Sequence, residues 1–236
     1  MKANQQGFTL VEIAIVLVII GLLLGGVLKG QELINSAKAK SLVNDFRTIS
    51  TAIYAYQDRF RFMPGDDPAA NQHVGGELAS TPSGDPHGNG RIGGNWNSST
   101  TTDESFLVWQ HLRLANLLTG TTSTSDTANY FPRNADNGRI GITGTAPITP
   151  ATSASGSSTG SESLPMTGAF FLCSDGISAR LARQVDSTMD DGNTQTGNVR
   201  AMQQVDGQGA ATGTATNITA QVESGTSSLY TVCVAF

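Results

Sequence analysis

One carboxylate, that of Glu12, lies inside the longest apolar run of the chain. The run extends from Phe8 to Leu28. As a helix with about 1.5 Å of rise per residue, it covers a hydrocarbon core of roughly 30 Å. A carboxylate in such a run is costly to insert, so it is usually retained for a charged partner or a function. The alternative is that Glu12, near the start of the run, extends to the lipid headgroups and has no further role.

A short polar segment with one lysine, residues 1–7, precedes the apolar run, and this order is also that of a secretory signal peptide. In a signal peptide the apolar part has about 7 to 15 residues and is followed by a small-residue cleavage site. Here the apolar run is longer, and the small residue, Gly7, comes before it. We therefore do not expect an ordinary signal peptidase to remove this segment.

The residues GFTLVE, from Gly7 to Glu12, resemble the processing box of type IV pilins and of the pseudopilins of type II secretion systems. The resemblance implies that a prepilin peptidase cleaves between Gly7 and Phe8, that the new Phe8 amine is methylated, and that the apolar helix is retained. It also implies that Glu12 of one subunit pairs with the Phe8 amine of a neighbouring subunit in a filament. The amine is cationic at neutral pH, so each group would satisfy the charge of the other.

Three functions stay open on this resemblance. The first is a structural subunit of a type IV pilus or related filament, built from copies of this chain. The second is a pseudopilin of a type II secretion system, and the third is a minor pilin or adhesin whose head is a binding module. The expected partners also include the prepilin peptidase, an assembly platform in the inner membrane, and membrane lipid before assembly. The expected location is the inner membrane, with the head in the periplasm, and then an extracellular surface filament.

Further stretches resemble a group of large prepilin-like proteins, which implies no enzymatic activity. They are PGD at 64–66, GNGRIGG at 88–94, ESFLVWQHLRLANLL at 104–118, and the stretch from Asp190 to Arg200.

The three histidines show no HExxH or other metal-ligand spacing, and no G-x-S-x-G elbow occurs. The net charge is −5, from 14 Lys and Arg against 19 Asp and Glu. Nucleic-acid binding by a broad cationic surface is therefore not expected.

Two cysteines, Cys173 and Cys233, lie in the C-terminal third of the chain. In an oxidising compartment they are expected to form a disulfide that closes a loop of about 60 residues. The alternative is two reduced thiols in a core. Many type IV pilins close a C-terminal loop with such a bond.

Calcium is the one cofactor that the sequence raises, because two polar loops carry oxygen ligands. In DPHGNGRI at 85–92, Asp85 and Asn89 occupy the first and fifth places of an EF-type loop, with Gly and Ile at the sixth and eighth. His87 at the third place and Trp96 at the twelfth do not fit this pattern.

The second loop is an acidic turn that contains Asp190, Asp191 and Asn193. These three residues supply carboxylate and amide oxygens within a few residues of one another. For both loops, a plain Asx-type turn is the alternative to a calcium site.

A long helix is predicted from about Phe8 to Phe62, with Pro64 expected to end it. Beyond the apolar run, large apolar side chains recur at alternating spacings of four and three, which places them on one helix face. They are Leu42, Phe46, Ile49, Ile53, Tyr56 and Phe60. We expect this stripe to pack on a globular head.

Four glycines weaken the helix, since each costs up to about 1 kcal/mol relative to alanine. They are Gly21, Gly25, Gly26 and Gly30. In many type IV pilins this region contains a proline and melts locally on assembly, whereas this chain has no proline there. Alternatively, Gly21 and Gly25 form a GxxxG face that allows close helix approach. Both interpretations stay open.

The fold class is predicted to be α+β, the type IV pilin fold, with the long helix packed on an antiparallel sheet. Thr101 and Glu104 fit a capping box that starts a second helix, with Gly120 as its stop. The other expected elements are strands at 169–173, 199–205 and 229–234, a short helix at 177–185 and a surface loop at 143–163. The expected divisions are a leader at 1–7, a membrane helix at 8–28, a packed helix at 29–62, and a head at 63–236 with a disulfide-closed C-terminal loop.

The lysines that follow the apolar run predict the opposite orientation of the helix in the membrane, with the head on the cytoplasmic side and not in the periplasm. Lys29, Lys38 and Lys40 follow the run, while only Lys2 and the amino terminus precede it. The positive-inside rule would then place the head in the cytoplasm. The processing box and the cysteine pair favour the periplasm, and we give them priority.

Overall fold

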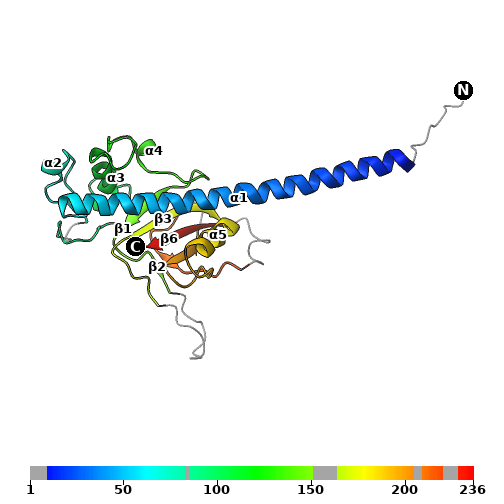
Figure 1. Cartoon of the computed structure of the whole chain (residues 1–236). Coiled ribbons are helices and arrows are strands. Elements are labelled where there is room, and N and C mark those ends of the chain that lie inside the picture. The colour runs from blue at the N-terminus through cyan, green and yellow to red at the C-terminus, as the bar shows by residue number, and fades with distance from the viewer. Residues whose placement is uncertain (1–9, 83–85, 151–163, 205–208, 220–227) are drawn as a thin grey trace, which may run out of the picture. The chain divides into compact units, whose positions relative to one another are not determined.

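The computed structural model describes residues 10–82, 86–150, 164–204, 209–219 and 228–236. The chain divides into two compact units, residues 1–37 and 38–236. One helix, α1 (Leu10–Phe60), begins in the first unit and ends in the second (Figure 1). The predicted divisions after residues 7, 28 and 62 stay predictions.

Within the second unit, α1 buries a single stripe of side chains. The buried residues are Ala39, Leu42, Val43, Phe46, Ile49, Ser50, Ala52, Ile53 and Tyr56. Their spacing follows the helical period, so only one face of this part of α1 enters the core. The stripe predicted from the sequence is confirmed, with Phe60 partly buried at its end.

The end of α1 is set by Arg61 and not by Pro64, so the helix is two residues shorter than predicted. Arg61 has a φ of 66°, and its N–H donates to the carbonyl oxygen of Gln57 at 2.8 Å. A residue in the left-handed conformation with this bond is a common helix terminator. The chain then turns back, because the Tyr56 hydroxyl donates to Oδ2 of the buried Asp67 at 2.8 Å.

The described part of the second unit contains a four-stranded antiparallel sheet with the strand order β1-β3-β6-β4. Its strands are β1 (Ile140–Thr143), β3 (Phe171–Ser178), β4 (Val199–Gln203) and β6 (Leu229–Ala235). A separate parallel pair joins β2 (Ile148–Thr149) to β5 (Gly213–Thr214). The α+β fold class, with a long helix and an antiparallel sheet, is therefore confirmed.

The two faces of the sheet contact two different hydrophobic clusters, because side chains alternate along each strand. Leu172, Val232 and Val234 pack with the α1 stripe in the larger cluster. Phe171 and Cys173 point to the other face. There they join a smaller cluster with Trp96, Ile148, Met166, Met202, Ala215 and Cys233.

Four further helices complete the described part of the head. They are α2 (Ala70–His73), α3 (Glu104–Leu114), α4 (Thr127–Tyr130) and α5 (Ala179–Met189). Helix α3 carries the large buried side chains Phe106, Trp109 and Leu112 into the core. Helix α5 contacts β3, β4 and β6.

Helix α3 lies where the sequence predicts it, but both of its predicted ends are wrong. Its N-cap is Asp103 and not Thr101, and the Glu104 side chain accepts the N–H of Gly93 instead of completing a capping box. At the other end, Asn116 has a φ of 59°. The N–H groups of Asn116 and Leu117 donate to the carbonyls of Arg113 and Leu112, which is the Schellman pattern. The helix therefore ends before Gly120.

The remaining local predictions differ from the structure in detail. Strand β3 extends to Ser178, so Ile177 belongs to the strand, and α5 begins only at Ala179. Strand β1 was not predicted, and Ile148–Thr149 form β2 inside the expected surface loop. The rest of that loop, residues 151–163, and Val205 of the expected third strand lie outside the described residues.

The predicted disulfide is present between Cys173 and Cys233, which lie opposite each other on β3 and β6. The bond joins two neighbouring strands at the centre of the sheet, and both cysteines are fully buried. The 60 residues of sequence separation contain α5, β4 and β5.

Replacing both cysteines by alanine is expected to lower the free energy of unfolding by about 2–5 kcal/mol, because the unfolded chain regains the freedom of a long loop. The measurement is urea unfolding of the full chain in detergent, followed by tryptophan fluorescence. The double replacement Ser123→Ala and Ser125→Ala, at two exposed serines, is the control. Equal unfolding free energies for the cysteine variant and the wild type would contradict the prediction.

Candidate functional site

The N-terminal part of α1 exposes a long apolar surface. Its most apolar window of 18 residues has a mean hydropathy of 2.8, and none of that window is buried in the chain. Among the described residues this is the one helix with the length and composition to cross a membrane. The exposed large side chains between positions 10 and 28 are Leu10, Val11, Ile13, Ile15, Val16, Leu17, Val18, Ile19, Ile20, Leu22, Leu23, Leu24, Val27 and Leu28. An apolar surface of this extent marks contact with lipid or with other proteins.

Glu12 lies in the first turn of this helix and is exposed. A carboxylate in the first turn interacts favourably with the positive end of the helix dipole. Gly7 and Phe8, the predicted cleavage and methylation positions, lie outside the described residues. The roles predicted for all three residues stay predictions.

The four glycines of this helix do not interrupt it, since α1 is continuous from Leu10 to Phe60. A Cβ atom added at Gly21, Gly25, Gly26 or Gly30 would meet nothing within 4 Å. Nothing inside the described chain therefore requires glycine at these positions. A close helix approach at Gly21 and Gly25 would need a second chain.

The loop around Asn89, the first predicted calcium site, is held by a buried carboxylate. Asp66 is fully buried, and its oxygens accept the backbone N–H groups of Gly88, Asn89 and Gly90. The amides of the loop thus point toward a negative charge, which resembles the Asx-type alternative more than a cation loop. Asp85 lies outside the described residues, so calcium at Asp85 and Asn89 stays a prediction.

A second buried carboxylate, that of Glu104, lies next to this loop. Glu104 Oε1 contacts His87 Nδ1 at 2.5 Å, and Oε2 accepts the N–H of Gly93 at 2.6 Å. Burial raises the pKa of both Asp66 and Glu104, while their hydrogen bonds oppose that rise. These carboxylates organise the loop from within the protein and are not offered to a ligand in solvent.

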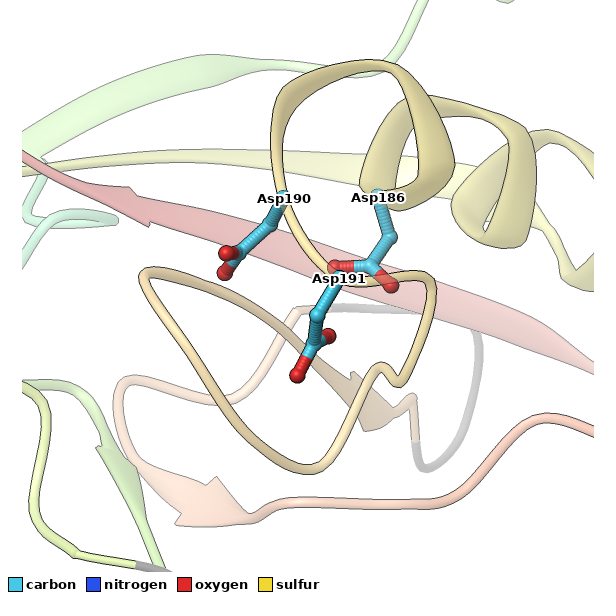
Figure 2. A group of neighbouring side chains, drawn as sticks. All are labelled: Asp186, Asp190 and Asp191. Carbon is cyan, nitrogen blue, oxygen red and sulfur yellow. The ribbon is translucent and has the colours of Figure 1, made fainter.

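The second predicted calcium site contains a third acidic residue that sequence reasoning missed. Figure 2 shows Asp186 beside Asp190 and Asp191 at the C-terminal end of α5. Each side chain offers one oxygen, and these three oxygens all lie within 4.8 Å of one another. The spacing in the sequence could have revealed it. Asp186 precedes Asp190 by four residues, and side chains four residues apart on a helix lie on the same face.

Two of the three carboxylates are used by the turn that follows α5. Asp190 Oδ2 accepts the N–H groups of Asn198 and Val199, at the start of β4. Gly197 lets the backbone pass this carboxylate, because its φ is +72° and an added Cβ would lie 1.9 Å from Asp190 Oδ2. Asp191 accepts the N–H of Asn193 and the hydroxyl of Thr196.

Asp186 differs from its two neighbours. It is fully buried, and neither of its carboxyl oxygens has a hydrogen-bond partner in the described part of the chain. Burial, followed by the charges of Asp191 and Asp190, raises the pKa of Asp186 to about 7. The nearby N–H of Gly192 lowers that pKa by a smaller amount, although it does not form a hydrogen bond of ordinary geometry.

The comparison with protein families gives one match. The family model described as the prokaryotic N-terminal methylation motif matches residues 2–28, which contain Gly7, Phe8, Glu12 and the start of α1. Together with the long apolar helix, this match supports a type IV pilin-like prepilin, as the sequence predicts. Comparison with curated proteins and with solved structures finds no match.

With divalent cations removed by EDTA, Asp186 is expected to lower the free energy of unfolding as the pH rises from about 4 to about 7. The folded state keeps a proton on Asp186 up to a pKa of about 7, whereas the unfolded state releases it near the ordinary aspartate pKa of 3.8. The advantage of Asp186→Asn over the wild type in unfolding free energy should therefore be larger at pH 8 than at pH 5. Urea unfolding of the full chain in detergent at the two pH values measures the difference.

The matched control is Asp58→Asn, at an aspartate that is 86% exposed on α1. Its unfolding free energy should follow that of the wild type at both pH values. If Asp186→Asn also had the unfolding free energy of the wild type at pH 8, the expected destabilisation by the ionised Asp186 carboxylate would be wrong.

Proposed function

We propose that this chain, a type IV pilin-like prepilin, is the structural subunit of a type IV pilus or related extracellular filament. The observation that carries the proposal is the exposed apolar part of α1, which lies within the match to the methylation motif at residues 2–28. Such a helix has two environments that satisfy it. One is the lipid bilayer before assembly, and the other is a bundle of identical helices in the filament core.

The chain in this proposal first spans the inner membrane with its head in the periplasm. Prepilin peptidase removes residues 1–7, and the assembly platform then moves the subunit from lipid into the filament. The Cys173–Cys233 bond supports the periplasmic side, because disulfides persist in oxidising compartments. That support outweighs the lysines that follow the apolar run.

Glu12 sets the register of assembly in this proposal. The apolar helix surface can pack on a neighbouring helix in many alternative registers, because nearly all of its side chains are apolar. A buried carboxylate without its partner is destabilising by about 3–5 kcal/mol, so a register that separates Glu12 from the Phe8 amine is strongly disfavoured. Pairing therefore contributes specificity more than net stability.

A pseudopilin of a type II secretion system is the second candidate, because the same motif and helix serve short periplasmic filaments. The third candidate, an adhesin or minor pilin, would use the head as a binding module. Both tryptophans of the chain, Trp96 and Trp109, are buried and are not available for stacking on a sugar. This observation favours a structural role for the head.

Electron microscopy of sheared surface filaments, with mass spectrometry of their subunits, tests the proposal. Long fibres made mostly of this chain and beginning at methylated Phe8 are the expected result. Processed chain found only in the membrane fraction would overturn the pilus proposal and favour the pseudopilin or the minor pilin.

Glu12→Ala is expected to be cleaved and inserted normally but to reduce filament yield by about tenfold or more, because the Phe8 amine loses its partner. The control is Glu32→Ala. It removes an exposed carboxylate of the same helix, and that carboxylate pairs with Lys29 at 2.7 Å. Immunoblots of processed chain and filament yield after shearing are the two measurements. Normal yield from Glu12→Ala would refute the proposed role of the carboxylate.

A further inference from the structure

We propose that Asp186, Asp190 and Asp191 bind one calcium ion at the C-terminal end of α5 (Figure 2). The three oxygens lie within 4.8 Å of one another. Two oxygens that bind the same calcium at 2.3–2.6 Å are at most about 5 Å apart, so the three carboxylates can share one ion. This proposal concerns the folded head and does not depend on filament assembly.

Asp186 is the observation that points to a ligand. A buried carboxylate is normally compensated by hydrogen bonds, by a cationic side chain or by a metal. The head follows this rule elsewhere, since Asp66 accepts three N–H groups and Glu104 contacts Gly93 and His87. Asp186 has no such hydrogen bond in the described residues, and it faces two more carboxylates. A bound cation compensates all three at once.

The charges around the three carboxylates are net negative, which favours the binding of a divalent cation. Arg200 is the cation that interacts with Asp190 and Asp191, but it forms no ion pair within 4.0 Å with any of the three carboxylates among the described residues. Its Nε donates to the carbonyl of Gly197, and its Nη1 has no partner in the described chain. Three ionised carboxylates carry more negative charge than Arg200 can balance, and a divalent cation supplies positive charge at this position.

The position at the end of α5 adds a further attraction. The C-terminal end of a helix carries partial negative charge from carbonyl groups without helical partners. Such an end disfavours carboxylates and favours cations. Asp186 lies in the last turn of α5, and Asp190 and Asp191 follow directly. A cation bound by three acidic residues at a helix C-terminus therefore also interacts favourably with the helix dipole.

The chemistry of the donors favours calcium. The group contains only carboxylates, without the histidine or cysteine ligands that zinc and copper prefer. Calcium accepts six to eight oxygen ligands in irregular geometry, whereas magnesium requires near-octahedral geometry and keeps several waters. Water molecules commonly complete the coordination of calcium in proteins, so three carboxylates are sufficient as the protein ligands.

Calcium at this position would tie the end of α5 to the turn that enters β4. Asp190 already holds Asn198 and Val199 at the start of that strand. The ion would connect this turn to Asp186 on the helix, and so cross-link two consecutive elements of the head. We therefore expect the stability of the head to depend on calcium concentration.

The test is thermal unfolding of the full chain in detergent at pH 8, first in EGTA and then in excess calcium or magnesium. At a free calcium concentration of about 100 times the dissociation constant, the midpoint should rise by about 5–10 °C. Isothermal titration calorimetry with calcium chloride should give one site per chain. An absence of both a shift and binding heat at 10 mM calcium, which is roughly ten times the weak end of known calcium modules, would overturn the proposal.

Variants assign the effect to the cluster. Asp186→Asn and Asp191→Asn should each abolish the calcium-dependent shift, while Asp58→Asn should keep it. Asp186→Asn should also be at least as stable as the wild type in EGTA, which separates loss of the ion from a failure to fold. A calcium shift of the same size in the wild type and in Asp186→Asn would place the ion elsewhere and would overturn the proposal. A larger shift with magnesium than with calcium would overturn the choice of ion.

Discussion

The structure depends on one constraint, which is that a single helix must satisfy two different surroundings. Between positions 10 and 28, α1 is apolar on all sides, and none of its most apolar window is buried in the chain. In the second unit only one face of α1 is buried, along a stripe from Ala39 to Tyr56, and that stripe forms much of the core. A helix that is apolar all round needs lipid or other helices around it, whereas a striped helix needs one protein face. The rest of the head is built to supply that face.

The head uses buried carboxylates as internal anchors. Asp66, Asp67 and Glu104 lie after the end of α1 or at the start of α3, and each accepts hydrogen bonds that fix a turn or loop. This arrangement lets irregular segments pack on the α1 stripe without leaving their backbone N–H groups unsatisfied. Asp186 is equally buried but accepts no hydrogen bond in the described residues, and its nearest acidic neighbours repel it. The contrast between these two kinds of buried carboxylate is the physical basis of the calcium proposal.

Sequence patterns predicted the regular elements well and their ends poorly. Periodicity placed α1, α3, β4 and β6, because apolar spacing reflects which face is buried. The ends were missed at Arg61, Asn116 and Asp103, where left-handed residues and long-range side-chain bonds decide the termination. Asp103, for example, accepts hydrogen bonds from Thr81 and Ser98, and no local capping rule contains those partners. Strand β1 was missed because it has only four residues, one of which is Gly141, a residue type depleted in strands.

The sequence by itself determined the N-terminal methylation motif, the apolar helix, the position of Glu12 and the expectation that two cysteines pair. Each of these is a property of consecutive residues or of a composition, so no distant contact is needed to recognise it. Only the tertiary structure decided that Cys173 faces Cys233 on neighbouring strands, that Asp66 holds the loop around Asn89, and that Asp186 joins the acidic turn. These arrangements depend on strand register, burial and helix ends. The disulfide register and the contact of Asp66 with its loop arise when segments far apart in the sequence pack together. Asp186 is close to Asp190 in the sequence, but its burial depends on the packing of α5 against the sheet.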